Sequence, residues 1–217
     1  MSESSALDGE ASRRLRDGAK DILGRELSGQ EVGAFEGYVD ELVIWQRHTR
    51  LVGRADPIWI VDNLLLDSLL FLRFLPHQHG RVLDLGSGAG IPGVPLKIVA
   101  PSLSFCLVEG RRKRASFLAS VVRRIGWRDV DVVGMRGEDA IRTGAIKAGS
   151  FDTVVSRCAG DAKGIVALGQ ALLQPYGALV ISGPPATLRP SLQAERVLVP
   201  RSIAGGNRAF WVWRRAA

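Results

Sequence analysis

The sequence predicts an α/β protein with a mostly parallel sheet, and two features of the chain carry this prediction. From residue 81 onward, short apolar runs alternate with segments of helical periodicity, beginning with RVLDLG and SFCLVEG. Such alternation is typical of β-α-β units with parallel strands and right-handed crossovers. Near the end, RVLVPRS and NRAFWVWRR are joined by glycines instead of a helix, which predicts an antiparallel hairpin at one edge of the sheet.

Length and composition indicate one domain with a short extension. The 217 residues are 46% hydrophobic and 24% charged, which suits a protein with a sizeable core. No apolar run reaches the roughly 18 residues of a membrane span, and the N-terminus has no apolar signal segment, so we expect a cytoplasmic protein without a membrane segment. Cys106 and Cys158 lie in apolar runs without partners at metal-ligand spacing, which indicates buried thiols and no metal.

The charge balance favours an anionic partner. Lysine and arginine total 29 against 22 acids, a net charge of +7 at pH 7, and nucleic acid is the obvious anionic class. Arginines that coat an ordinary surface explain the same excess equally well. Both interpretations stay open on charge alone.

Helical periodicity precedes the sheet. We expect a disordered tail over residues 1–9, a helical extension over 10–80 and the α/β domain over 81–217, with extension and domain packed as one compact unit. The extension holds a charged helix over 10–27 and a firmer helix over 29–50. Asp56 and Pro57 suit the N-cap and first position of a third helix, which ends at PHQHG.

The domain is expected to contain seven strands with helices between them. The expected strands cover residues 81–86, 104–110, 129–135, 151–157, 177–183, 196–202 and 207–215. The expected helices cover residues 94–100, 111–126 and 163–173.

A glycine-rich loop follows the first strand. The pattern G-x-G-x-G occupies Gly86, Gly88 and Gly90. Glycine is needed where φ is positive or where a ligand touches the backbone, and doubly wound sheets bind ligands at the carboxyl ends of their strands. The loop is therefore expected to line a nucleotide-type ligand, although many tight strand-to-helix turns with two glycines bind nothing.

Two acids accompany this loop. Asp84 lies two residues before Gly86, and Glu109 ends the second strand, 23 residues after Gly86. An ionised carboxylate only accepts hydrogen bonds, so Glu109 suits the two hydroxyls of a ribose. Glu109 also suits the N-terminus of the helix that begins in EGRRKR, and the two roles are compatible.

The start of the helix after the loop argues against a phosphate ligand. Pro92 and Pro95 remove two amide donors from its first turn, where a pyrophosphate would need them. The chain also lacks the G-K-[ST] of a P-loop. A phosphate-free adenosine ligand fits better, and we expect S-adenosylmethionine.

The glycine loop and its surroundings carry a family resemblance. The run from LDLGSGAGIPGVPL to SVVRRIG resembles that of the bacterial small-subunit (16S) ribosomal RNA guanine-N7 methyltransferases, the glucose-inhibited division protein B family, whose loop reads D-x-G-[ST]-G-x-G-x-P-G-[IV]-P-L. The likeness extends to Asp67-Ser68-Leu69, FDTVVSRCAG and NRAFWVWRR, and covers roughly residues 35–215. It implies a Rossmann-like class I S-adenosylmethionine-dependent methyltransferase that acts as a monomer on ribosomal RNA or a ribosomal particle.

The resemblance also implies a set of site residues. Ser156 and Arg157 match the S-R-A that ends the family's fourth strand, with Cys158 in the place of alanine, and Arg157 would position the base beside the cofactor. No general base is expected, because guanine N7 carries no proton to remove and orientation would carry catalysis. The implied cofactor-binding residues are Gly86, Gly88, Gly90, Ile91, Glu109, Gly137, Glu138 and Arg157, and the implied RNA-binding residues are Arg136, Arg208 and Arg112.

Structural roles stay open for the basic residues. Arg157 is also suited to capping a strand end. The run RRKR at 111–114 suits either RNA phosphate or a solvated helix face, and we expect the solvated face for most of it.

Three departures from the family pattern fall in regions expected to face the substrate. Gln46 and Arg50 stand where the family has asparagine, Leu64 stands where it has histidine, and Ser182 stands where it has lysine. The cofactor loop is intact. The leading hypothesis is therefore a small-subunit ribosomal RNA guanine-N7 methyltransferase. The alternatives are a paralogue that methylates a small molecule or another RNA, and a non-catalytic RNA-binding protein.

Overall fold

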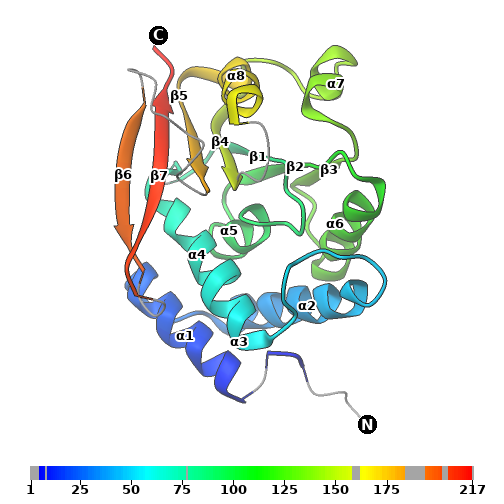
Figure 1. The fold of residues 1–217 in the computed structure, drawn as a ribbon, viewed down its shortest axis with the longest axis vertical. Coiled ribbons are helices and arrows are strands. Elements are labelled where there is room, and N and C mark those ends of the chain that lie inside the picture. Colours follow the sequence, from blue (N-terminus) through cyan, green and yellow to red (C-terminus); the bar gives the residue numbers. More distant parts are fainter. Residues whose placement is uncertain are drawn as a thin grey trace.

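One mixed sheet forms the centre of the protein. The structure is a computed structural model and describes residues 5–7, 9–76, 78–157, 162–183, 194–201 and 205–216. Within those residues, seven strands form a single sheet in the order β3-β2-β1-β4-β5-β7-β6 (Figure 1). The strands are β1 (Arg81–Leu85), β2 (Ser104–Val108), β3 (Val130–Val133), β4 (Phe151–Arg157), β5 (Leu173–Ser182), β6 (Glu195–Pro200) and β7 (Asn207–Arg214).

Strand directions confirm the predicted fold class. The neighbours among β1 to β5 pair in parallel, whereas β7 runs antiparallel to both β5 and β6. The chain builds outward from β1 to β3 and then returns to the other side of β1 with β4. Strand order therefore reverses between β1 and β4, and sheets of this type bind ligands beyond the carboxyl ends of the strands at this point.

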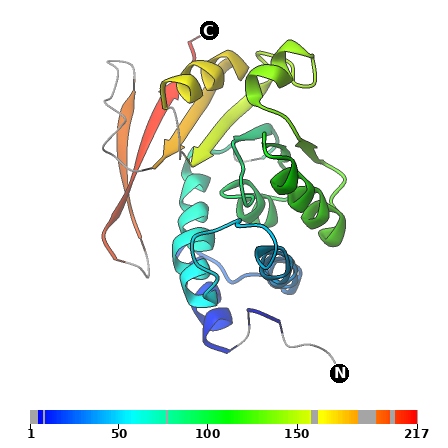
Figure 2. The same cartoon turned by 45° about the vertical axis from the view of Figure 1, so that its right-hand side comes forward.

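Helices cover both faces of the sheet because successive strand residues point to opposite sides. Val82 joins the core with the N-terminal helices, α5 and α6, and Leu83 joins the core on the other face with α7 and α8 (Figures 1 and 2). Among the described helices, none is long and apolar enough to cross a membrane. The bounds are α1 (Gly9–Leu23), α2 (Gly29–Gln46), α5 (Gly93–Val99), α6 (Arg112–Ile125), α7 (Gly137–Arg142) and α8 (Ala162–Leu172).

The third predicted helix is a series of short segments of different pitch. Asp56 caps it as predicted, because its Oδ1 accepts a hydrogen bond from Trp59 N at 2.7 Å. A π-helical turn then interrupts the α-helix, and such turns rotate the side chains that follow and are frequent at functional sites. The segments are α3 (Pro57–Ile60), the π-helix η1 (Val61–Leu65), α4 (Leu66–Leu69) and the 3-10 helix η2 (Leu70–Phe74).

The second helix ends earlier than predicted. α2 stops at Gln46, whose side chain binds the segment that follows. Its Oε1 accepts hydrogen bonds from Leu51 N at 2.9 Å and Val52 N at 3.1 Å, and its Nε2 donates to Val52 O at 3.0 Å. Glutamine at this position therefore has a structural task, which is to hold a turn over the carboxyl edge of the sheet.

Smaller differences have local causes. The six residues of α7 are too few for helical periodicity to reveal, so this helix is missing from the prediction. In the expected tail, Leu7 is buried and Ala6 N binds Asp40 Oδ1 at 2.8 Å, so residues 5–7 lie against α2. Cys158, which is matched to the alanine of the family's S-R-A, lies outside the described residues. So does Ala204, which belongs to the expected hairpin turn.

A buried tyrosine connects the helical extension to the glycine loop. Tyr38 on α2 is fully buried, and its hydroxyl donates a hydrogen bond of 2.5 Å to the carbonyl oxygen of Ala89. Its ring also packs 6.4 Å from that of Phe117 on α6. The loop after β1 is thus held from the side of the extension as well as from the sheet.

We predict that Tyr38→Phe lowers the free energy of unfolding by about 1–3 kcal/mol, because the buried Ala89 carbonyl loses its partner. Urea unfolding of the variant and the wild type measures the difference. Tyr176→Phe is the matched control, since Tyr176 is 78% exposed and should unfold like the wild type. Equal stability of Tyr38→Phe and the control would contradict the assigned role.

Candidate functional site

The glycine loop leaves β1 with alternate residues in the left-handed region. Gly86, Gly88 and Gly90 have φ values of 77°, 58° and 84°, which glycine adopts without strain. A Cβ on Gly90 would lie 2.6 Å from Val94 Cγ2, whereas a Cβ on Gly86 would meet nothing within 4 Å. Packing of the loop on α5 therefore requires Gly90, and Gly86 presents open backbone.

The N-terminus of α5 is closed from inside the protein. Gly93 N donates a hydrogen bond of 2.9 Å to Asp84 Oδ2, and a Cβ on Gly93 would lie 2.7 Å from the same oxygen. Pro92 and Pro95 have no amide hydrogen. An amide that a phosphate would use is already bound to a carboxylate, which is a second physical reason for a phosphate-free ligand.

Asp84 is a fully buried acid with spare hydrogen-bonding capacity. Its Oδ1 is buried and has no hydrogen-bond partner among the residues that the structure describes. Burial raises the pKa of Asp84 to about 7; hydrogen bonds with Gly93 and Ser87 oppose the rise, and the charge of Glu109 adds to it. A carboxyl group with a raised pKa and an unpaired oxygen is typical of a functional site. It suits a ligand group that is cationic or donates a hydrogen bond.

Glu109 joins the glycine loop to the start of α6. Its carboxylate is nearly buried, with Oε2 accepting from Gly88 N at 2.9 Å and Oε1 from Arg111 N at 2.7 Å. The expected role at the helix start is therefore present in the structure. Each oxygen keeps a further acceptor direction, which leaves the expected ribose role available.

A crevice of about 540 Å³ lies at the carboxyl ends of β1 and β4, and Gly86, Gly88 and Glu109 line it, whereas the fully buried Asp84 is outside its lining. A second hollow of about 260 Å³ adjoins it, because Leu85, Gly86 and Ile165 line both. Gly90 lies behind the loop surface, against α5. Of the predicted cofactor residues, five line the crevice, namely Gly86, Gly88, Ile91, Glu109 and Arg157. Gly137 and Glu138 line the adjoining second hollow, together with Arg136.

Apolar and basic side chains both line the crevice. Val52 and Trp59 contribute apolar surface from the helical extension, and Arg157 and Arg208 contribute charge from β4 and β7. Both arginines pair with the buried carboxylate of Asp67. In the part of the chain that the structure describes, no group of three or more His, Cys, Asp or Glu side chains is placed to hold a metal ion.

Not every predicted RNA-binding residue reaches this crevice. Arg112 is exposed on α6, and the crevice is lined instead by its neighbours Arg111 and Arg114. Arg114 Nη2 also donates to Arg50 O at 3.2 Å, which ties the turn after α2 to α6. Asp67 is a site residue that the sequence pattern did not single out for a role, although a lone acid in an apolar helix is itself a signal.

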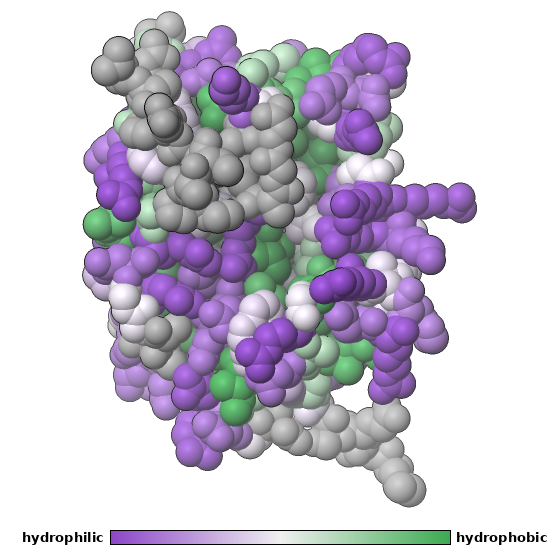
Figure 3. All heavy atoms as spheres, viewed as in Figure 1, coloured by the Kyte–Doolittle hydropathy of each residue, from purple (hydrophilic) through white to green (hydrophobic). Residues whose placement is uncertain are grey.

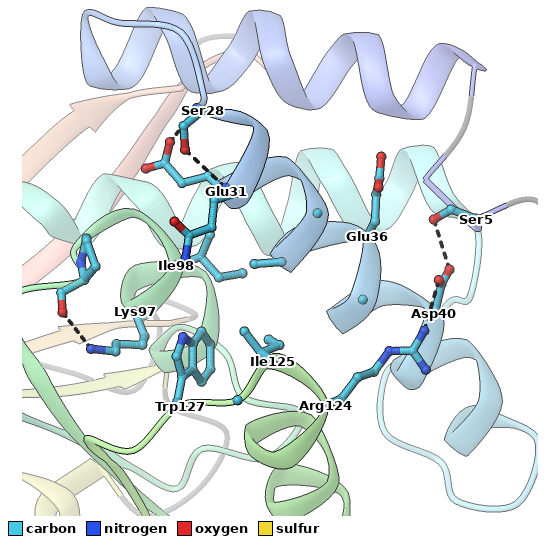
Figure 4. Close-up of a pocket in the computed structure, with 16 residues that line it drawn as sticks. Ser5, Ser28, Glu31, Glu36, Asp40, Lys97, Ile98, Arg124, Ile125 and Trp127 are labelled. Atoms are coloured by element: carbon cyan, nitrogen blue, oxygen red, sulfur yellow. Dashed lines mark hydrogen bonds and ion pairs between the residues drawn. The ribbon is translucent and has the colours of Figure 1, made fainter.

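A larger cavity of about 660 Å³ lies elsewhere, between α2 and the end of α6. Figure 4 shows polar contacts among its lining residues: Arg124 pairs with Asp40, and the Ser28 hydroxyl accepts a hydrogen bond from Glu31 N. Lys97 is held by the carbonyl oxygens of Pro101 and Leu103 and by Asp129. The glycine loop contributes nothing to its described lining, so the crevice, and not this cavity, is the candidate site.

Comparison with known proteins assigns the chain to a family. A family model named GidB and described as rRNA small subunit methyltransferase G matches residues 31–183. The chain belongs to the GidB family. A protein named ribosomal RNA small subunit methyltransferase G from Syntrophus aciditrophicus is 36% identical over 155 residues, 71% of this chain and 64% of that relative. One of the same name from Xylella fastidiosa is 38% identical over 176 residues, 81% of this chain and 78% of that relative.

Solved structures support the fold. A SAM-dependent methyltransferase from Aquifex aeolicus aligns with a TM-score of 0.53 at 14% identity, over 72% of this chain and 92% of that chain. TYW2 from M. jannaschii, solved in complex with AdoMet, aligns with a TM-score of 0.52 at 11% identity, over 69% of this chain and 74% of that chain. The GidB match itself includes the glycine loop, Glu109 and Arg157 but ends before β6 and Arg208.

We predict that the stability of the ligand-free protein depends on pH through Asp84. The folded state keeps a proton on Asp84 up to about pH 7, whereas the unfolded chain releases it near pH 4. The wild type therefore loses stability as pH rises through this window, by up to about 1.4 kcal/mol per pH unit. Asp84→Asn lacks this contribution, so the difference between variant and wild type should change with pH.

Urea unfolding at several pH values between 5 and 8 measures this difference. Asp139→Asn is the control, because Asp139 lies on the outer side of α7 and pairs with Arg142 at the surface. A constant difference between Asp84→Asn and the wild type over the whole range would show that Asp84 does not titrate as assigned.

Proposed function

We propose that this protein transfers a methyl group from S-adenosylmethionine to N7 of a guanine in small-subunit ribosomal RNA. One observation carries the proposal: a glycine loop clamped by Glu109 shares a crevice with Arg157 and Arg208, in a chain of the GidB family. Relatives of similar sequence bear the name ribosomal RNA small subunit methyltransferase G.

The residues at the crevice fit S-adenosylmethionine. Glu109 offers acceptors for the ribose, and Gly86 leaves room for close approach of the ligand to the backbone. The unpaired Oδ1 of Asp84 suits a positively charged or donating group. When bound, S-adenosylmethionine supplies a methyl group on a cationic sulfur. Such a cation near Asp84 would favour the ionised carboxylate, so affinity should increase as pH rises through about 7.

The basic side of the crevice suits a guanine in RNA. Guanine N7 is a nucleophile without a proton, so its bond to the methyl carbon forms as the carbon–sulfur bond breaks, and the electron pair stays on sulfur. Positive charge passes to the base and no proton moves, so the protein's task is to align the base. Arg157 and Arg208 line the crevice where that base would enter, and an arginine fork matches guanine O6 and phosphate oxygens.

The surface around the crevice suits an RNA strand. Arg111 and Arg136 are exposed at its rim, and Arg50 and Arg54 are exposed on the turn after α2. Figure 3 shows hydrophilic side chains over most of the visible described surface, with apolar patches small and scattered between them. Such a rim would bind RNA phosphate groups whatever the base sequence and so position the strand. Contacts with the base in the crevice would select the target.

The departure from the family pattern at Gln46 has a structural explanation, so it does not argue for a different substrate. Gln46 uses its side-chain amide on the backbone of Leu51 and Val52. A change at this position therefore preserves a turn and does not by itself alter a contact with substrate. Arg50, Ser182 and Leu64, which lines the crevice, remain as differences in regions expected to face the substrate, and methylation of another RNA or a small molecule is the alternative that they motivate.

We predict that Glu109→Gln weakens S-adenosylmethionine binding by about ten- to a hundredfold. The glutamine amide has one acceptor oxygen fewer than the carboxylate and turns an NH₂ group toward the donors of the ligand. Loss of a hydrogen bond to a charged group costs about 1.5–3 kcal/mol of binding free energy. Calorimetric titration with the cofactor measures the change. Glu36→Gln is the matched control, because Glu36 lines the separate cavity beside α2. Unchanged affinity in Glu109→Gln would exclude Glu109 from the cofactor site.

The proposed reaction predicts one missing 7-methylguanine in small-subunit RNA when the gene is deleted. Mass mapping of modified nucleotides should show its return with the wild-type gene and not with Arg157→Ala, which loses alignment of the base. Purified protein with labelled cofactor should label small-subunit RNA or particles. An unchanged modification map after deletion would reject the guanine-N7 assignment, and labelling of small molecules alone would favour the alternative.

A further inference from the structure

Asp67 lies at the meeting point of three arginines. It is on α4, and its side chain has 0% exposure. Arg208 binds it with two nitrogens, of which Nε lies 2.9 Å from Oδ1. Arg157 Nη2 lies 3.3 Å from Oδ2, and Arg201 Nε lies 3.4 Å from Oδ1. One buried carboxylate therefore gathers three guanidinium groups.

These arginines come from separate parts of the fold. Arg157 ends β4, Arg208 lies near the start of β7, and Arg201 directly follows β6. At close range, three like charges repel one another in a partly buried environment. Their gathering thus depends on the carboxylate that all three share, which comes from the helical extension and not from the sheet.

The cluster is positively charged overall. Three guanidinium groups against one carboxylate leave a surplus of two positive charges. Burial lowers the pKa of Arg157, the charge of Asp67 opposes this, and Arg208 and Arg201 add to the lowering. Because arginine stays protonated in proteins, the surplus remains and favours a bound anion.

Two donors in this region lack an acceptor. Within the part of the chain that the structure describes, Arg157 Nη1 and Ser182 Oγ are buried and have no hydrogen-bond partner. The two residues are direct partners in the register of β4 and β5, and Ser182 is 0% exposed. Buried donors without partners are rare in folded proteins and indicate a missing acceptor. An anion rich in oxygen atoms would satisfy donors and surplus charge together.

Asp67 is itself held in a defined position. The π-helical segment η1 precedes it, and Arg201 Nη2 donates to Asp62 O at 3.3 Å and to Asn63 Oδ1 at 3.2 Å within that segment. Arg201 thus links the strand pair β6–β7 to the helical extension, while Arg157 and Arg208 face the crevice. The carboxylate can therefore orient the two crevice arginines against a fixed support.

We propose that Asp67 is a positioning residue that assembles Arg157, Arg201 and Arg208 into a binding site for a phosphate group of the RNA strand. The inference rests on the proposed function for the identity of the strand. The phosphate follows from the cluster, because a tetrahedral anion accepts bonds from several guanidinium groups at once. A phosphate held beside Arg157 and Arg208 would fix how far the neighbouring base reaches toward the cofactor.

Titration of the full-length protein with inorganic phosphate at constant ionic strength tests the site directly. We expect the wild type to bind phosphate and Asp67→Asn to bind it at least tenfold more weakly. Asp139→Asn is the matched control, since it is the same substitution at an acid that pairs with Arg142 on the surface. It should bind phosphate within twofold of the wild type.

Two further measurements separate positioning from simple loss of structure. Asp67→Asn should raise the KM for RNA at least tenfold, with S-adenosylmethionine affinity within twofold of the wild type. Inorganic phosphate should compete with RNA and not with S-adenosylmethionine. If Asp67→Asn fails to fold, Arg201→Gln carries the test, because Arg201 is one of the three arginines that Asp67 gathers and lies outside the described crevice lining. It should weaken phosphate binding severalfold.

Several results would overturn the inference. These are a folded Asp67→Asn that binds phosphate as tightly as the wild type, wild-type protein that binds no phosphate, and Arg201→Gln with unchanged phosphate affinity. Phosphate that binds without competing with RNA would identify a free-phosphate site and reject the RNA assignment. If the wild type does not methylate RNA at all, the proposed function fails, and the phosphate titrations still decide whether Asp67 assembles an anion site.

Discussion

The hydrogen bond from Gly93 N to the buried carboxylate of Asp84 anchors the glycine loop that lines the crevice. It closes the N-terminus of α5 from within and holds the glycine loop between β1 and that helix. Glu109 holds the outer side of the same loop through Gly88 N. Because two acids occupy the amides that a phosphate would otherwise bind, the loop is left with open backbone and acceptors, which suits a cationic nucleoside.

Charge is divided across the crevice. Glu109 lines the crevice beside the glycine loop, with Asp84 buried directly before that loop, and Arg157 and Arg208 line it from β4 and β7. A cofactor with a cationic sulfur and an anionic RNA strand would each meet groups of opposite charge. The proposed transfer moves positive charge from sulfur to the base, so the arrangement also suits the charges present before and after the reaction.

The helical extension is part of the site and not an appendage to it. Tyr38 binds the loop through Ala89 O, Gln46 holds a turn that brings Val52 to the crevice, and Asp67 pairs with arginines of the sheet. The contacts of Tyr38 and Asp67 join helices of the extension to the glycine loop and to the carboxyl edge of the strands. Burial of these helices therefore stabilises the fold and shapes the crevice through the same residues.

The sequence by itself determined the succession of strands and of the helices other than α7, the glycine loop, the position of Glu109 and the unsuitability of the α5 start for phosphate, because these follow from local periodicity, backbone freedom and missing amides. It placed Arg157 and Arg208 only through a resemblance. Only the tertiary structure decided that Asp67 joins them with Arg201, that Gln46 serves the backbone, and that Arg111 and Arg114 reach the crevice where Arg112 does not. Contacts between residues more than a hundred positions apart, such as Asp67 and Arg208, leave no local pattern, since they arise when the sheet brings separate segments to one edge.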